Sequence, residues 1–144
     1  MPRDKSQVAA LPIRRAANGA LEVLLITSRE TGRWIIPKGW PMKGLADHEA
    51  AAQEAREEAG VVGRIGEAPI GDYPYWKRQK EGFEFCLVTV YPLVVERQRK
   101  DWRERGQRLA SWLTVDDAAE HVDEAGLSGL IHDLPRILRE KGIL

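Results

Sequence analysis

The sequence predicts an α/β protein in which a mixed β-sheet carries helices on its faces. Along its 144 residues, segments with strand character alternate with turns and with helical segments. The segment 83–95 is apolar at consecutive positions, whereas a strand with one face in water is apolar only at alternate ones. Such a strand is buried on both faces, so the sheet is expected to be covered on both sides.

A hairpin is predicted at the start of the chain. Its strands cover residues 11–17 and 21–27, and the connection contains Asn18-Gly19, the strongest short hairpin signal. A short strand over residues 33–36 follows.

The next element is a helix over residues 48–58. Asp47 can cap its N-terminus, and Gly60 suits the left-handed residue that ends a helix. Small residues recur every four positions, at Ala51, Ala55 and Ala59. This small-residue face would let the helix lie close against a sheet.

The rest of the chain supplies more strands and two further helices. The predicted strands are 61–68, 73–77, 83–95 and 109–113. A helix through about His121 begins at a cap on Thr114 or Asp116. A terminal helix spans 127–141, and Pro135 predicts a kink or a break within it.

Three glutamates in the helix at 48–58 form the strongest candidate site. Glu54, Glu57 and Glu58 are three and four residues apart, so their carboxylates share one helix face. They also occupy the C-terminal turns, where the helix dipole disfavours acidic groups. A glutamate-rich helix is often only a solvated face, but this placement indicates a bound cation. Oxygen ligands without Cys or His suit Mg²⁺ or Mn²⁺.

The segment 39–61 resembles the Nudix box in its spacing. The box is a Gly, five residues, Glu, seven residues, Arg-Glu, an apolar residue, any residue, Glu-Glu, any residue, Gly and an apolar residue. The positions in register are Gly39, Glu54, Ala55, Glu57, Glu58, Gly60 and Val61. Two positions depart from it, because Leu45 replaces the first Glu and Gln53 replaces the Arg.

The resemblance implies a single Nudix domain over residues 1–144, with an α/β/α sandwich fold and a flexible N-terminus over 1–8. It also implies a metal site formed by Glu54, Glu57, Glu58 and the Gly39 carbonyl, for Mg²⁺ with Mn²⁺ as the alternative. Within the family, the chain is similar to the diphosphoinositol polyphosphate phosphohydrolase and diadenosine polyphosphate hydrolase group. This similarity lies in 33–37, in 60–66, and in the Trp112-Leu113-Thr114 and Asp117-Ala118 junction.

The expected activity is metal-dependent cleavage of a diphosphate linkage in a small phosphorylated molecule. Candidate substrates are diadenosine polyphosphates, inositol pyrophosphates and related nucleoside diphosphate derivatives. Two alternatives remain: an RNA 5′-end pyrophosphohydrolase, and a non-catalytic Nudix sensor of a phosphorylated metabolite. Glu58 is the first choice for a combined ligand and general base, and Glu104 is a possible distal carboxylate.

Positive and aromatic side chains near the box are candidates for substrate binding. Lysine and arginine bind phosphate as a point charge and as a bidentate fork, respectively. The candidates are Lys38, Lys43, Arg14, Arg29, Arg33, Trp40 and Trp76.

The overall composition limits the partners. Lys plus Arg and Asp plus Glu number 22 each, so no net charge attracts nucleic acid or a membrane. The single Cys86 lies in an apolar run and is expected to be a buried thiol in a reducing compartment. The N-terminus lacks an apolar signal core. We therefore expect a cytoplasmic protein that acts as a monomer or homodimer on a small phosphorylated substrate.

Overall fold

The computed structural model describes residues 5–144, apart from the side chain of Arg78. The strands are β1 (Lys5–Arg15), β2 (Leu21–Thr27), β3 (Trp34–Ile35), β4 (Lys38–Gly39), β5 (Val61–Ile65), β6 (Gly71–Gln79), β7 (Gly82–Gln98) and β8 (Ala110–Thr114). The helices are α1 (Asp47–Ala59), α2 (Val115–His121), α3 (Ala125–His132) and α4 (Leu134–Lys141). None of these helices is long and apolar enough to cross a membrane.

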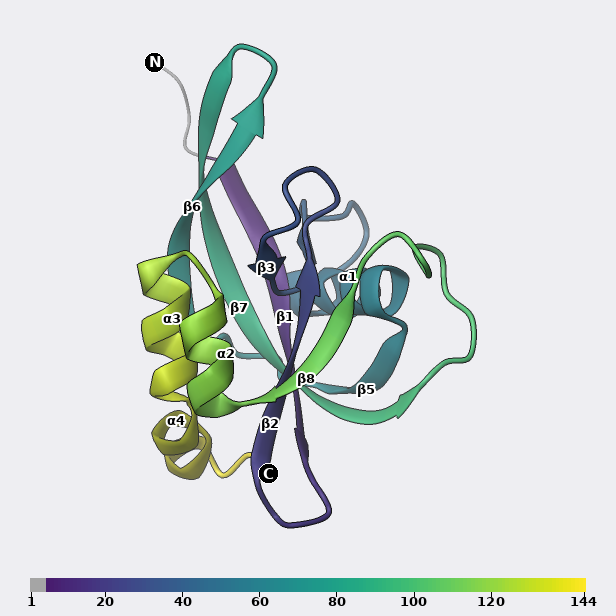
Figure 1. Ribbon diagram of the computed structural model, residues 1–144, viewed down its shortest axis with the longest axis vertical. Coiled ribbons are helices and arrows are strands. Elements are labelled where there is room, and N and C mark those ends of the chain that lie inside the picture. Colours follow the sequence, from purple (N-terminus) through teal and green to yellow (C-terminus); the bar gives the residue numbers. More distant parts are fainter. Residues whose placement is uncertain (1–4) are drawn as a thin grey trace.

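The strands form one mixed sheet, as predicted, with β1 near its centre (Figure 1). β1 pairs in parallel with β7, from Lys5↔Cys86 to Ile13↔Val94, and antiparallel with β2. It also pairs antiparallel with β4, which places Gly39 opposite Val8. This last pairing fixes the start of the box segment to the middle of the sheet.

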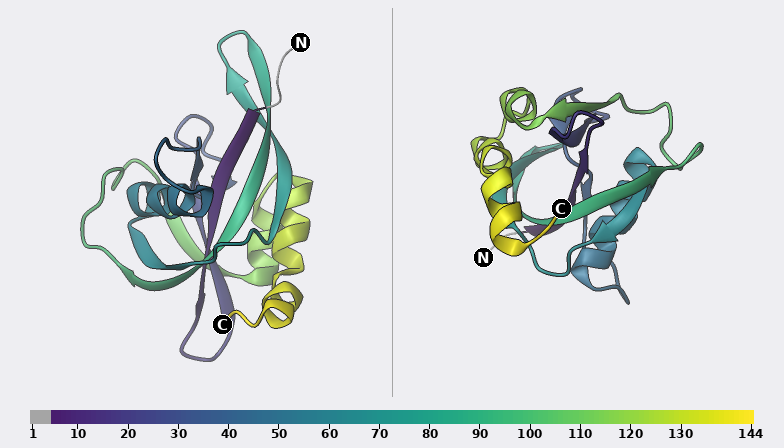
Figure 2. Two further views of the ribbon diagram at one scale, coloured as in Figure 1. Left: turned by 180° about the vertical axis from the view of Figure 1, so that it is seen from behind. Right: turned by 90° about the horizontal axis from the view of Figure 1, so that it is seen from below.

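Helices cover both faces of the sheet, which confirms the layered α/β architecture. α1 lies on one face, and α2, α3 and α4 lie together on the other (Figures 1 and 2). Successive residues of β1 enter different cores: Ala9 and Leu11 pack with α2, α3 and α4, whereas Val8 and Ala10 pack with α1. Burial on both sides explains why this strand shows no polar alternation.

The N-terminal prediction differs from the structure. The sequence predicts a flexible segment over 1–8 and a strand that starts at residue 11. In the structure, β1 already begins at Lys5, and the remaining four residues of the predicted flexible segment lie outside the described part. The first half of β1 is held by its parallel pairing with β7, more than 80 residues further along the chain. Local sequence patterns carry no signal for such a distant partner.

α1 begins one residue earlier and ends one residue later than predicted, and the predicted N-cap at Asp47 is wrong. Its N-cap is Ala46, so Asp47 lies in the first turn, where its charge favours the positive end of the helix dipole. The Glu49 side chain accepts a hydrogen bond from the Ala46 N–H at 2.9 Å. Gly60 ends the helix at φ 71°, in the left-handed region. The predicted alanine face is confirmed, because Ala51, Ala55 and Ala59 are at most 1% exposed.

The predicted terminal helix is divided in two. α3 ends at His132, Asp133 forms the junction, and Pro135 lies in the first turn of α4, where its missing N–H has no cost. The predicted cap on Thr114 is confirmed, since its side chain accepts a hydrogen bond from the Asp117 N–H. Cys86 is buried and free, as expected.

Candidate functional site

A cavity of about 270 Å³ opens where β4 and the last turns of α1 meet two loops and another strand. The β2–β3 loop, the β7–β8 loop and β6 supply its other walls. Seven of the sequence-predicted residues line it: Arg29, Arg33, Lys38, Gly39, Trp40, Glu54 and Glu58. The predicted distal carboxylate Glu104 lines it as well.

Gly39 and Glu54 are in close contact inside this cavity. A Cβ atom at residue 39 would lie 2.5 Å from both Cδ and Oε1 of Glu54. Real Cβ contacts are never that short, so the Glu54 carboxylate occupies space that only a glycine leaves free. The first residue of the box is therefore a glycine because a carboxylate lies against its backbone.

Glu58 is the most buried acidic group of the cavity, with 5% of its surface exposed. Burial, followed by a hydrogen bond with Glu54, raises its pKa to about 9, although the Arg108 guanidinium acts in the opposite direction. The Lys38 backbone N–H donates to Glu58 Oε1 over 3.4 Å. A buried carboxyl group thus lies beside a half-buried one, and burial disfavours the ionised form of Glu58.

Arg108 lies between two acidic residues of the cavity, Glu58 on α1 and Glu104 on the β7–β8 loop. Its Nε lies 2.8 Å from Glu104 Oε1, its Nη2 lies 3.7 Å from Glu58 Oε1, and its Nη1 donates to the Thr27 carbonyl at 3.0 Å. Arg29 approaches the same Glu104 oxygen at 3.8 Å. Arg108 was not among the predicted site residues. It is one of many basic residues in a loop, and only its burial distinguishes it.

The opposite wall is cationic and aromatic. Lys38 Nζ lies 3.9 Å from the centroid of the Tyr75 ring, and burial followed by repulsion from Lys77 lowers the pKa of Lys38 to about 8. Lys77 Nζ lies 5.8 Å from the ring of Trp40, which is 40% exposed. Arg33 lies on the same wall, where its Nη1 pairs with Glu124 at 3.4 Å.

Gln7 on β1 also lines the cavity, and no sequence pattern predicted it. It is 2% exposed, and its Oε1 has no hydrogen-bond partner among the described residues. Burial of an unpaired amide oxygen is unfavourable by about 1–3 kcal/mol. The cavity therefore contains one hydrogen-bonding group that the protein itself does not satisfy.

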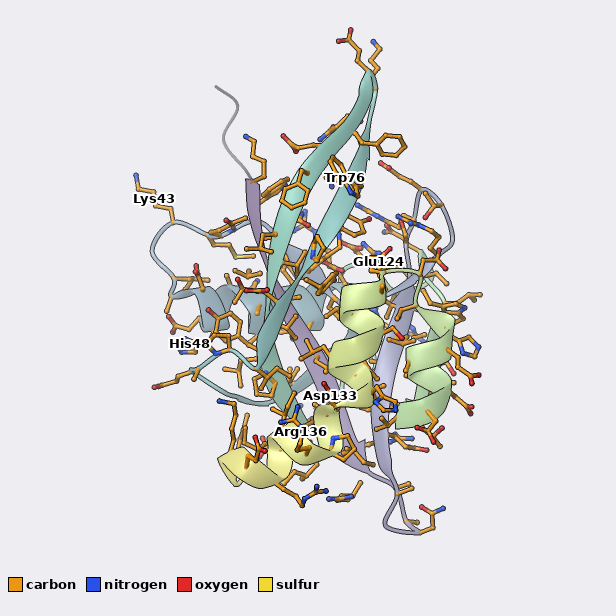
Figure 3. All side chains as sticks on the ribbon, turned by 90° about the vertical axis from the view of Figure 1, so that its left-hand side faces the viewer. Lys43, His48, Trp76, Glu124, Asp133 and Arg136 are labelled. Atoms are coloured by element: carbon orange, nitrogen blue, oxygen red, sulfur yellow. The ribbon has the colours of Figure 1, made fainter. Side chains whose placement is uncertain are left out.

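Three predicted substrate-binding residues lie outside the cavity. Arg14 pairs with Glu22 at 2.9 Å and stacks on the Trp112 ring at 4.1 Å. Lys43 is exposed on the loop before α1 and points outwards, away from Glu124 (Figure 3). Trp76 is 58% exposed on the β6–β7 hairpin. These positions follow from strand pairing and loop direction, which the sequence pattern alone does not define.

Glu57 is separated from the other two glutamates. Its Oε2 accepts a hydrogen bond from Gln53 Nε2 at 2.8 Å, and its Oε1 pairs with Arg103 at 2.8 Å. Within residues 5–144, no three acidic, histidine or cysteine side chains lie close enough together to hold a metal ion as they stand. The structure thus brings together Glu54 and Glu58, whereas the sequence predicted that all three glutamates converge.

The residues of the cavity fit a hard divalent cation. Glu54 and Glu58 offer oxygen ligands only, and burial followed by the hydrogen bond with Glu54 raises the pKa of Glu58, which a bound cation would reverse. A cation between them would replace the proton that they otherwise share. Because residue 39 is a glycine, the Glu54 carboxylate can lie directly against the backbone there.

The Arg103–Glu57 pair should compete with metal binding. Arg103 is 76% exposed, and exposed pairs contribute about 0.2–1 kcal/mol. Arg103→Gln should therefore lower the Mg²⁺ concentration needed for half-maximal thermal stabilisation by about two- to fivefold. Arg105→Gln is the matched control, since Arg105 stacks on Trp102 and pairs with no carboxylate in the described residues. An unchanged or higher Mg²⁺ requirement in Arg103→Gln alone would contradict this role.

The metal-free protein should lose stability as the pH rises. Because the folded-state pKa of Glu58 is raised from 4.5 to about 9, the folded protein binds this proton more tightly than the unfolded chain does. This contribution is complete below about pH 4.5 and disappears as the pH approaches about 9. Melting curves in a chelator from about pH 5 to pH 8.5 should thus show a smaller decline for Glu58→Gln than for the wild type. Parallel declines would refute the assignment.

Comparison with known proteins supports the same reading of the box. The NUDIX domain family model matches residues 5–134. The chain is 30% identical over 125 residues to Nudix hydrolase 12, mitochondrial, of Arabidopsis thaliana, covering 84% of this chain and 62% of that protein. It is 34% identical over 100 residues to diphosphoinositol polyphosphate phosphohydrolase 3-beta of Bos taurus, covering 67% and 57%. It spans less than two thirds of the length of these relatives.

A solved structure shows the same fold. The C. elegans Ap4A hydrolase in a binary complex matches with a TM-score of 0.70 and 21% sequence identity. The match covers 94% of this chain and 98% of that one.

Proposed function

This chain belongs to the Nudix family, and we propose that it is a metal-dependent pyrophosphohydrolase that cleaves a diphosphate linkage in a small phosphorylated molecule. The observation that carries the proposal is the pair of the buried Glu58 and the half-buried Glu54, with Glu54 against the backbone of Gly39. A carboxylate pair of this kind has no structural benefit, since desolvating like charges is costly. Perturbed acidic groups in a cavity are typical of functional sites.

The two sides of the cavity have complementary tasks in this proposal. When bound, Mg²⁺ supplies charge that neutralises the anhydride oxygens and makes a water more acidic. Glu54 and Glu58 hold that charge in place from the rigid α1, and the Glu58 carboxylate is the proposed acceptor of the water proton. Glu104, held by Arg108 at 2.8 Å, is the second candidate for this proton transfer. Lys38 and Arg33 bind the phosphates, and Trp40 contacts the rest of the substrate.

Glu57 is proposed as a third metal ligand that pairs with Arg103 until the metal binds. Its carboxylate lies one helix position from Glu58 and is retained by an exposed Arg103. Exchange of this weak pair for a cation needs only a side-chain rotation. Gln53 stands where the box usually has Arg, and as a neutral hydrogen-bond donor it holds Glu57 less firmly than a charged one would.

The substrate class is proposed from the cavity and from the relatives. A cavity with two lysines, three arginines and an aromatic wall suits a phosphate chain attached to a flat or ring-shaped group. Diadenosine polyphosphates, inositol pyrophosphates and nucleoside diphosphate derivatives all have this form. The names of two similar proteins, an Ap4A hydrolase and a diphosphoinositol polyphosphate phosphohydrolase, support the first two classes.

A non-catalytic sensor is the second candidate, and the position of Glu57 favours it. A binding module would need the cationic wall but not a complete set of metal ligands. In such a module, the pair between Glu57 and Arg103 would persist in the presence of substrate and Mg²⁺.

Product analysis with a panel of substrates tests the proposal. The purified protein is incubated with Mg²⁺ or Mn²⁺ and with diadenosine polyphosphates, inositol pyrophosphates, nucleotide sugars, nucleoside triphosphates and 5′-triphosphorylated RNA. We expect metal-dependent cleavage of at least one small substrate. Binding without cleavage of any compound, by a folded protein, would support the sensor. Cleavage of the RNA alone would replace the small-molecule assignment.

A further inference from the structure

A second hollow, of about 850 Å³, lies beside the outer surface of α1. The loop of residues 99–109, between β7 and β8, forms its other side, as the position of this loop next to α1 in Figures 1 and 2 shows. Four arginines line it, together with two acidic residues. The arginines are Arg56, Arg99, Arg103 and Arg105.

These arginines exceed what the structure needs for its own ion pairs. Arg103 pairs with Glu57, and Arg56 donates to Gln53. In the described part of the chain, Arg99 and Arg105 form no ion pair, and Arg105 instead lies 5.7 Å over the Trp102 ring. Cations near the C-terminus of α1 favour the helix dipole, but one such charge already achieves this. The excess positive charge indicates a binding function.

The loop that carries three of these arginines is fixed to α1. The Arg99 N–H donates to the Gly60 carbonyl at 2.7 Å, and the Glu104 N–H donates to the Glu57 carbonyl at 3.0 Å. The Trp102 ring packs directly over Gly60, at a place where a Cβ would collide with it. The backbone that carries these arginines is therefore fixed by hydrogen bonds, so that less backbone conformational entropy is lost when they bind a ligand.

We propose that this hollow is a second anion site, which binds a chain of phosphates on a small molecule. Guanidinium groups bind phosphate oxygens through paired hydrogen bonds, and several arginines around one concave surface match several phosphates. The hollow shares no lining residue with the metal cavity, and it borders the metal site only through Glu57, the proposed third ligand. The inference goes beyond the proposed activity and does not require it.

A small polyphosphate fits this surface better than a nucleic acid does. The positive charge is concentrated in one hollow of limited volume, and the chain as a whole has a net charge of 0. A nucleic acid needs a basic strip that follows its backbone. Arg103 would exchange Glu57 for a phosphate, so an anion in the hollow would also release a carboxylate towards the metal cavity.

Calorimetric titration with inorganic tripolyphosphate, in a chelator and at low ionic strength, tests the site without turnover. The wild type should bind, and Arg99→Gln/Arg105→Gln should bind at least ~10-fold more weakly, because two phosphate contacts are lost. The matched control is Arg139→Gln/Lys141→Gln on α4, which removes the same charge far from the hollow and should bind like the wild type. Equal weakening in both double variants would show a general charge effect and overturn the proposal.

The location is tested by nuclear magnetic resonance of the arginine Nε–H groups during the same titration. The resonances of Arg99 and Arg105, assigned by single substitutions, should shift saturably. Shifts confined to Arg29, Arg33 and Arg108 would place the anion in the metal cavity and refute the second site. No binding by the wild type, or tighter binding of an unphosphorylated RNA oligomer than of tripolyphosphate, would also overturn it.

Discussion

Glu58→Gln should lower metal-dependent turnover at least ~10²-fold and at the same time make the metal-free protein more stable. The two effects have one cause. The Glu58 carboxylate is buried and hydrogen-bonded to Glu54, and its pKa is raised to about 9. In the metal-free protein at neutral pH, ionising this group is therefore unfavourable, and a neutral amide of the same shape removes that cost.

The gain in stability should be about 1–3 kcal/mol at neutral pH, less than the full shift implies, because Glu54 and Glu58 titrate together. Arg108 does not become unpaired in this variant, since its Nε keeps Glu104 at 2.8 Å. With Mg²⁺ present, the order should reverse. The wild type gains stability from binding the ion, whereas the variant has lost a ligand and gains less.

Melting temperatures with chelator and with excess Mg²⁺, together with turnover on the best substrate of the panel, check this prediction. Glu120→Gln is the matched control, because Glu120 is exposed on α2 far from the cavity. Glu57→Gln should also lower turnover by about 10²-fold, but with little change in metal-free stability, since Glu57 is neutralised by Arg103. Unchanged turnover in both variants would remove the catalytic assignment.

Gly39→Ala should lower turnover by about 10- to 100-fold without unfolding the protein. The new Cβ would lie 2.5 Å from Oε1 of Glu54, so the Glu54 carboxylate must move away. The backbone itself is not strained, because the φ angle of Gly39 lies outside the left-handed region. The loss should thus appear in turnover and in Mg²⁺ affinity more than in stability.

A second glycine gives the control for Gly39→Ala. Gly129 lies within α3, and a Cβ there would meet no atom within 4 Å. Gly129→Ala should therefore leave turnover unchanged and raise stability by about 0.5–1 kcal/mol, through the better helix propensity of alanine. If Gly39→Ala kept the turnover and Mg²⁺ affinity of the wild type, the contact between Gly39 and Glu54 would have no functional importance.

Much of the cavity was predictable because the box is a local pattern. Gly39, Glu54 and Glu58 follow from spacing on one turn and one helix, and Lys38 and Trp40 are their sequence neighbours. Arg108, Gln7 and Tyr75 were not predictable, since they come from a loop and two strands that reach the cavity only through the sheet. Arg14 and Lys43 look equally suitable in the sequence, but one is paired on the β1–β2 hairpin and the other is in solvent.

By itself, the sequence determined the helices, the principal strands and the row of glutamates, because periodicity, caps and turn residues act over a few positions. Only the tertiary structure decided that β1 pairs in parallel with β7, and that Glu57 faces Arg103, 46 residues away, while Glu54 and Glu58 face the cavity. Local sequence patterns cannot distinguish the environments of neighbouring carboxylates on one helix. They differ only when distant loops supply a cation to one of them and exclude water from another.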